Sequence, residues 1–147
     1  MKTFDRFGPL AARTALALIF LSSGLSKLAA PESTGSYIAS KGLPFGTLLA
    51  VAAGVLELAA GTSVLLGLRA RWGAFALIAF LIPVTLIFHN PFGLQGTAAQ
   101  MQMIQFMKNL AIAGGLLAIA AFGSGPVSLD ARVGAGHPLA VGTRPTH

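Results

Sequence analysis

The sequence predicts an all-α protein, a bundle of four transmembrane helices with both termini in the cytoplasm. Two features of composition lead to this fold class: 54% of the 147 residues are hydrophobic, and only ten Lys or Arg and four Asp or Glu are present. A soluble domain carries charge on about a quarter of its residues. The third observation is a series of apolar stretches, each long enough to span a bilayer core of about 30 Å. Together they predict one membrane-embedded domain over residues 1–132.

The four helices are expected at residues 10–28, 45–68, 72–88 and 101–122. The first ends before Pro31, and its Gly/Ser-containing continuation to residue 36 is expected to be a loop, followed by a short amphipathic piece around 37–40. The uncharged run 72–107 is too long for one crossing, and the polar, Gly- and Pro-containing segment 89–96 divides it. Gly and Pro residues at 123–126 end the fourth helix, and residues 133–147 are expected to be a disordered cytoplasmic tail.

Basic residues at the helix ends predict the orientation in the membrane. They precede the first helix, join the second to the third and follow the fourth, and four crossings place all of them on one side. We therefore expect both termini on the cytoplasmic side of a bacterial inner membrane. An alternative is that residues 15–25 are the core of a cleavable signal peptide; Arg13 and Lys27, charged at its two edges, argue against this. The basic residues are Lys2, Arg6, Arg69, Arg71, Arg132 and Arg144.

Several function classes are disfavoured by composition. The chain has no cysteine, so it holds no disulfide, thiolate zinc site or iron–sulfur cluster. Its basic residues stand singly between apolar runs, which argues against nucleic acid as a partner. His89 as a metal or haem ligand is disfavoured because His137 and His147 fall in the tail on the opposite side. No metal site is predicted.

Charged residues inside the expected helices point to a site, because a charge at the centre of a membrane helix costs about 2.5–3.5 kcal/mol. Glu57 lies at mid-span, and a rise of about 1.5 Å per residue makes a contact with Lys108 feasible. We expect an outward-opening polar pocket between the helices. The alternative is that Glu57 and Lys108 form only a structural ion pair. The candidate ligand-binding residues are Lys27, Glu57, His89, Gln105, Lys108 and Asn109, and no catalytic residue is predicted.

Helical spacing also predicts which faces pack. Residues 13, 17, 20, 24 and 27 share one face of the first helix, and this face is expected to look inward. Gly54, Glu57 and Gly61 form a stripe typical of a helix pressed against a neighbour. At the inner end of the bundle, Arg13 is expected to pair with Asp130 as a structural latch.

An ordered set of short motifs then resembles the DoxX family of small bacterial membrane proteins, over roughly residues 4–132. The proline of Pro91-Phe92 departs from the aromatic pair expected after His89-Asn90. The motifs are Arg13, Ser23-Gly24-Leu25-Ser26-Lys27, Gly54-Val55-Leu56-Glu57, Leu65-Leu66-Gly67, His89, Phe106-Met107-Lys108-Asn109, Gly114-Gly115, Gly123-Ser124-Gly125 and Ser128-Leu129-Asp130.

The resemblance implies a function linked to quinones. The family takes its name from a subunit described with a terminal quinol oxidase, and it is similar to membrane subunits of thiosulfate:quinone oxidoreductases. The expected role is a membrane subunit in quinone/quinol redox or oxidative-stress chemistry, at most a quinone-binding subunit and not itself the catalyst. No cofactor is expected within the chain apart from a bound quinone or quinol. The expected partners are the lipid bilayer, redox partner subunits or further copies of the chain.

Two other functions remain open. One is a carrier for a small solute or lipid, which would act as a dimer because four helices are few for alternating access. The other is a structural or assembly subunit without an activity of its own.

Overall fold

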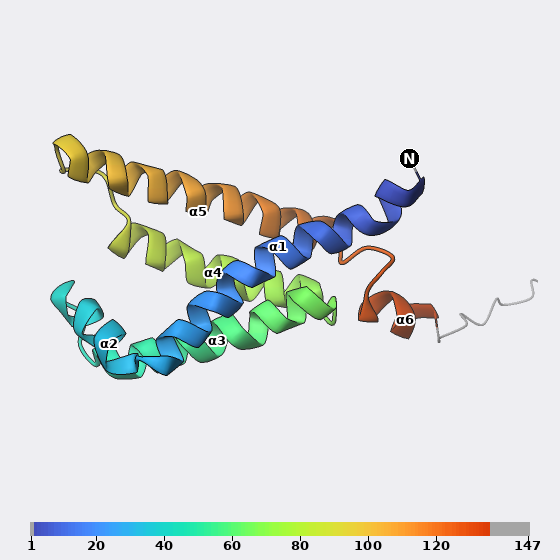
Figure 1. Cartoon of the computed structure of the whole chain (residues 1–147), viewed down its shortest axis with the longest axis horizontal. Coiled ribbons are helices and arrows are strands. Elements are labelled where there is room, and N and C mark those ends of the chain that lie inside the picture. The colour runs from blue at the N-terminus through green and yellow to red at the C-terminus, as the bar shows by residue number, and fades with distance from the viewer. Residues whose placement is uncertain (1, 136–147) are drawn as a thin grey trace, which may run out of the picture.

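A computed structural model describes residues 2–135 as an all-helical fold (Figure 1). Four of the helices, α1, α3, α4 and α5, are long and apolar enough to cross a membrane, which confirms the predicted fold class. The orientation of the termini stays a prediction. The helices are α1 (Lys2–Ala29), α2 (Pro31–Ser40), α3 (Gly46–Leu66), α4 (Ala70–Phe88), α5 (Gly96–Phe122) and α6 (Leu129–Ala135).

The two ends of the bundle differ. We call one of them the α2 end: α1 and α4 end there, α3 and α5 begin there, and α2 lies across the chain reversal (Figure 1). We call the other the α6 end, since it carries helix α6 together with the start of α1. Helix α1 packs along α3 and α4 packs along α5, whereas α1 and α5 meet only over a short stretch. Helix α3 also packs along α4, to nearly the same extent as α4 along α5, so the four long helices follow one another in the order α1, α3, α4 and α5.

The hydrophobic core joins these four helices in the half nearer the α6 end. Val64 of α3, Leu77 of α4 and Leu116 of α5 are fully buried, together with small residues that let the helices approach. Gly73 shows the closeness of α3 and α4 here, because a Cβ atom on it would lie 2.9 Å from the carbonyl oxygen of Ala60. The half nearer the α2 end is less filled, and this is where the cavity described below lies.

Helix α2 corrects the prediction of a loop after the first helix. Pro31 occupies the first turn of a ten-residue helix, a position where its missing N–H removes no hydrogen bond. Gly35 is needed for packing rather than for a turn, since a Cβ atom on it would lie 2.5 Å from the amide nitrogen of Thr47. The composition that resembled a loop is therefore that of a short helix crossing closely over α3.

Other boundaries also differ from the expected ones. Helix α1 begins at Lys2 rather than residue 10, and α5 begins at Gly96 rather than near residue 101. The first turns of α5 contain Ala98, Ala99 and Gln100, which are good helix formers. Helix α6 extends through residues 133–135, which were expected in the tail; the rest of that predicted tail, 136–147, lies outside the described residues.

The predicted inward face of α1 is confirmed: Arg13, Ala17, Phe20 and Gly24 are its buried residues. The stripe on α3 is confirmed as well, with Gly54, Glu57 and Gly61 all buried. The two faces meet at Gly24, where a Cβ atom would lie 2.9 Å from the carbonyl oxygen of Gly54. The backbones of α1 and α3 therefore approach closely beside the charged residues.

At the α6 end, the predicted ion pair between Arg13 and Asp130 is wrong. Within residues 2–135 the two side chains form no direct ion pair. The guanidinium of Arg13 donates instead to the backbone carbonyls of Leu65, Ser124 and Val127. It is buried at 3% exposure, so protein surrounds it on nearly all sides. Arg13 thus ties α1 to the end of α3 and to the segment after α5.

Asp130 has a different role in the same region. Its carboxylate accepts hydrogen bonds from the backbone amides of Arg69 (2.7 Å) and Ala70 (3.2 Å), at the start of α4. These amides have no partner within their own helix. Ser124 links the two charged residues, because its hydroxyl donates to Asp130 while its carbonyl accepts from Arg13. Arg13 and Asp130 therefore do hold the α6 end together, but through bonds to backbone groups rather than to each other.

Candidate functional site

A cavity of about 660 Å³ occupies the half of the bundle nearer the α2 end. All five helices from α1 to α5 contribute to its wall. Its lining is mostly apolar, with Phe20, Leu56 and Phe80 among the larger side chains. Its polar side chains include two hydrogen-bonded groups, one on α1 and α3 and one on α4 and α5, besides Ser26 of α1 and Thr34 and Tyr37 of α2. A largely apolar cavity with a few placed polar groups is the usual form of a small-molecule site.

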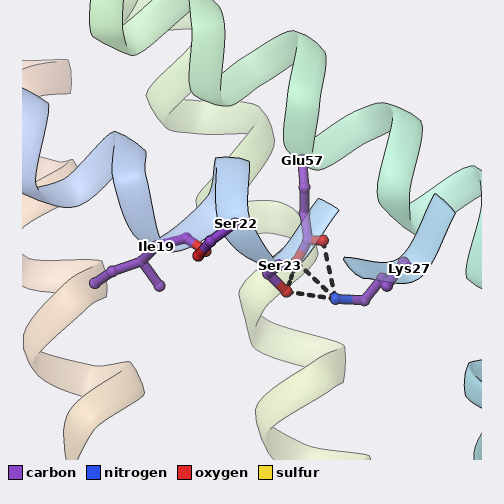
Figure 2. A network of polar contacts seen from close by, with 5 residues as sticks. All are labelled: Ile19, Ser22, Ser23, Lys27 and Glu57. Atoms are coloured by element: carbon purple, nitrogen blue, oxygen red, sulfur yellow. Dashed lines mark hydrogen bonds and ion pairs between the residues drawn. The ribbon is translucent and has the colours of Figure 1, made fainter. Parts of the chain in front are cut away.

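The first polar group consists of Ser23, Lys27 and Glu57 (Figure 2). The ammonium of Lys27 donates to both carboxylate oxygens of Glu57, at 2.9 and 3.2 Å, and to the hydroxyl of Ser23 at 2.5 Å. That hydroxyl in turn donates to Glu57 Oε1 at 3.2 Å. Each member therefore contacts the other two, and the cluster has no net charge.

The local sequence explains this geometry. Ser23 and Lys27 are four residues apart on α1 and so lie one above the other on the same face. Gly24 lies between them and lets α3 come close enough for Glu57 to reach both. Glu57 is only 4% exposed, and burying a carboxylate in this way requires a paired and hydrogen-bonded partner. The cluster meets that requirement.

The predicted contact between Glu57 and Lys108 is wrong, because Lys27 occupies the position assigned to Lys108. Lys108 is exposed on α5 and does not line the cavity. Its neighbour Asn109 does line it, and one residue along a helix is a rotation of about 100°, which is enough to turn a side chain from the cavity to the outer surface.

The second polar group lies on α4 and α5. Asn109 donates through Nδ2 to the hydroxyl of Thr85 at 2.9 Å, and this hydroxyl donates to the carbonyl of Leu81 at 2.7 Å. His89 is the residue after the last turn of α4, and its Nδ1 lies 3.2 Å from Gln102 Oε1. Each contact thus holds one cavity-lining side chain, Asn109 or His89, against the neighbouring helix.

Four of the six predicted ligand-binding residues thus line one cavity: Lys27, Glu57, His89 and Asn109. Gln105 and Lys108 do not. Sequence reasoning missed Ser23, whose position one turn before Lys27 is a usable signal, and Tyr37, which was assigned to a short amphipathic piece with no part in the site. Within the described part of the chain, no three His, Asp or Glu side chains gather as a metal site would require.

The arrangement can hold an uncharged molecule that has hydrogen-bonding oxygens. Asn109 keeps one amide N–H and its carbonyl oxygen beyond the bond to Thr85, and His89 keeps its second ring nitrogen beyond the contact with Gln102. The neutral Lys27–Glu57 cluster adds a titratable carboxylate to the opposite wall. An apolar ring would fill the space between these walls.

Comparison with known proteins agrees with this architecture. The DoxX family model matches residues 8–90. The chain is 37% identical over 123 residues to the inner membrane protein YphA of Escherichia coli K12, covering 84% of this chain and 88% of that protein. It is 32% identical over 130 residues to the inner membrane protein YqjF of the same strain, covering 88% and 95% respectively. No solved structure matches the chain. The chain is therefore a membrane protein that belongs to the DoxX family.

Proposed function

We propose that this chain is an inner-membrane subunit of a quinone-linked redox system, and that its cavity binds the head group of a quinone or quinol. The observation that carries the proposal is the combination, in one cavity of about 660 Å³, of an apolar lining with hydrogen-bonding groups on opposite walls. Its size falls in the range of about 300–1,000 Å³ found for small-molecule sites.

The residues present fit a quinone head group. Its two carbonyl oxygens need hydrogen-bond donors. Asn109 has an amide N–H that its contact with Thr85 leaves unused, and Nε2 of His89 donates when the imidazole is protonated, since Nδ1 already faces the carbonyl oxygen of Gln102. Its ring needs apolar walls, which Phe20 and Leu56 supply among others. A quinol presents hydroxyl groups instead, and the same amide and imidazole can accept from these.

Reduction of a quinone to a quinol consumes two electrons and two protons. Glu57 and His89 are titratable groups in the cavity wall and are suited to passing protons to and from the head group. The electrons come from a redox partner subunit in this proposal. The chain's contribution is to bind and orient the head group within the membrane and to supply a proton path.

We also infer that both termini face the cytoplasm, so that the α2 end and the cavity lie on the opposite side. The support is the gathering of basic residues at the α6 end, as the positive-inside rule predicts. A reporter that is active only in the periplasm tests this orientation. It should be active when inserted between residues 90 and 95 and inactive at the C-terminus, and the reverse pattern would overturn it.

A binding experiment tests the proposed ligand. The chain is reconstituted in lipid nanodiscs and titrated with a tail-less quinone analogue. Asn109→Leu and His89→Phe should each weaken binding about tenfold, the equivalent of about 1.4 kcal/mol and in the range of one hydrogen bond. Lys108→Met is the matched control, because Lys108 lies one residue from Asn109 and outside the cavity, and it should leave the affinity unchanged. Equal affinity in all variants, or no binding by the wild type, would contradict the proposal.

One observation favours a second candidate, a purely structural role for the charged cluster. The hydrogen bonds among Ser23, Lys27 and Glu57 occupy the cluster's own groups, as a helix cross-link would. Exchanging Lys27 and Glu57 distinguishes the two functions. A structural cross-link tolerates the exchange in every assay, whereas a quinone site regains folding but not quinol-dependent activity.

A further inference from the structure

Besides Ile19, Ser26 and Tyr37, which are also exposed, four cavity-lining residues on α3 and α4 face the outside of the bundle as well as the cavity. They lie in pairs near the α2 end, Leu49 and Ala52 on α3 and Pro83 and Ile87 on α4. All four are exposed, with Leu49 at 40% and Ile87 at 41%. Within each pair the residues are three or four positions apart, so each pair lies on one helix face. We call this set the α3–α4 rim.

The rim lies where α3 and α4 have separated. Near the α6 end the two helices are in close contact, as Gly73 and Ala60 show, and their buried core residues are there. Nearer the α2 end the cavity lies between them instead. Both helices are long and apolar enough to cross a membrane, so the outer side of the rim faces lipid chains rather than water.

The end of the cavity beneath α2 differs from the rim because an aromatic contact crosses it, although Tyr37 itself is 49% exposed. Ile38 of α2 is only 7% exposed and lines the cavity from that end. Tyr37 of α2 packs on Phe88, at the end of α4, with ring centroids 5.6 Å apart. An aromatic contact thus joins α2 to α4 across this end, whereas the rim presents only aliphatic side chains.

We infer that the α3–α4 rim is a lateral portal, through which the ligand enters from the bilayer and leaves its apolar chain in the lipid. The inference rests on the proposed function and specifies the ligand class: a quinone with a long hydrocarbon tail, whose head group lies between the polar walls. Polar groups inside and aliphatic groups at the portal match the two parts of such a molecule. A water-soluble solute would gain nothing from an aliphatic opening toward lipid.

Tryptophan substitutions at neighbouring positions test the portal. Leu49→Trp and Ile87→Trp place a bulky ring at the opening. Leu48→Trp and Leu86→Trp are the controls, because Leu48 and Leu86 are exposed at 67% and 58% on the same helices but do not line this cavity. Binding is measured in nanodiscs for two ligands with the same head group, one with a long tail and one without.

The portal predicts that Leu49→Trp and Ile87→Trp weaken binding of the long-tailed ligand about tenfold or more. Binding of the tail-less analogue should stay within about twofold, which also shows that the variants are folded. The controls should bind both ligands as the wild type does. If the wild type binds both ligands and the rim substitutions do not discriminate between them, the portal is wrong and the proposed function stands. If the wild type binds neither, the proposed function fails and the portal with it.

Discussion

Replacing Lys27 by methionine should destabilise the bundle strongly, because it leaves the carboxylate of Glu57 buried without a cation. The substitution removes the ion pair at 2.9 Å and the hydrogen bond to Ser23. Two hydrogen bonds to or from a charged group, at about 1.5–3 kcal/mol each, sum to about 3–6 kcal/mol, and we expect a loss of about 3–5 kcal/mol. This equals the usual cost of removing one partner from a buried pair. The side chain of Lys27 is only 22% exposed, so water or headgroups can replace little of the interaction.

A double-mutant cycle in mild detergent or bicelles measures this loss as the free energy of unfolding. Lys27→Met and Glu57→Met should each be strongly destabilising, whereas the double variant should lie close to the wild type, since no charge remains buried. Lys108→Met is the matched control and should change the free energy by less than about 0.5 kcal/mol, because Lys108 is exposed. The reasoning is refuted if Lys108→Met costs as much as Lys27→Met, or if the double variant is the least stable of the set.

Three further predictions concern packing and the α6 end. Gly24→Ala should reduce the free energy of unfolding by about 1–3 kcal/mol, because the added Cβ atom would press on α3. Gly114→Ala should be neutral or stabilising by up to about 1 kcal/mol, since nothing lies within 4 Å of a Cβ atom at that position. Thermal unfolding in detergent compares the two variants, and equal effects would count against the contact between α1 and α3. Asp130→Ala should reduce the free energy of unfolding by about 0.5–2 kcal/mol and speed amide hydrogen exchange at the first turn of α4. The control Asp5→Ala should have neither effect. Unchanged exchange in Asp130→Ala would mean that the carboxylate does not cap the helix. Arg13→Met should reduce the free energy of unfolding by about 3 kcal/mol or more, because three backbone carbonyls lose a charged donor. Chemical unfolding measures this change, and a reduction below about 1 kcal/mol would exclude the structural latch.

The fold was largely predictable because the solvent dictates it. In a membrane every backbone polar group must be satisfied within the protein, as a helix does within one segment, so long apolar segments locate the crossings. The helical period then predicts the packed faces, including the buried stripe of Gly54, Glu57 and Gly61. Helix α2 was missed because Pro31 and Gly35 are read locally as loop residues, whereas one starts a helix and the other permits a contact with a distant segment.

The site was only partly predictable because partner choice depends on helix rotation and crossing. Residue counting estimated the depth of Glu57 and Lys108 along the membrane normal but not the direction in which Lys108 points. Lys27 was placed correctly on the inner face, yet the close approach of α1 and α3 at Gly24 determines that it reaches Glu57 first. Asp130 shows the same limit, since its partners are backbone amides of Arg69 and Ala70, which side-chain chemistry alone does not identify.

The most direct test of the central claim is the quinone content of the purified protein. The chain is isolated in mild detergent from its native membrane, and the bound lipids are extracted and quantified by mass spectrometry. Wild type is compared with Ala53→Trp, which fills the cavity from its α3 wall, and with Val55→Trp, at a 54% exposed position on α3 outside the cavity. The proposed function predicts a stoichiometric quinone in the wild type and in Val55→Trp, and its loss in Ala53→Trp. A wild-type protein without quinone, or equal amounts in all three, would contradict it.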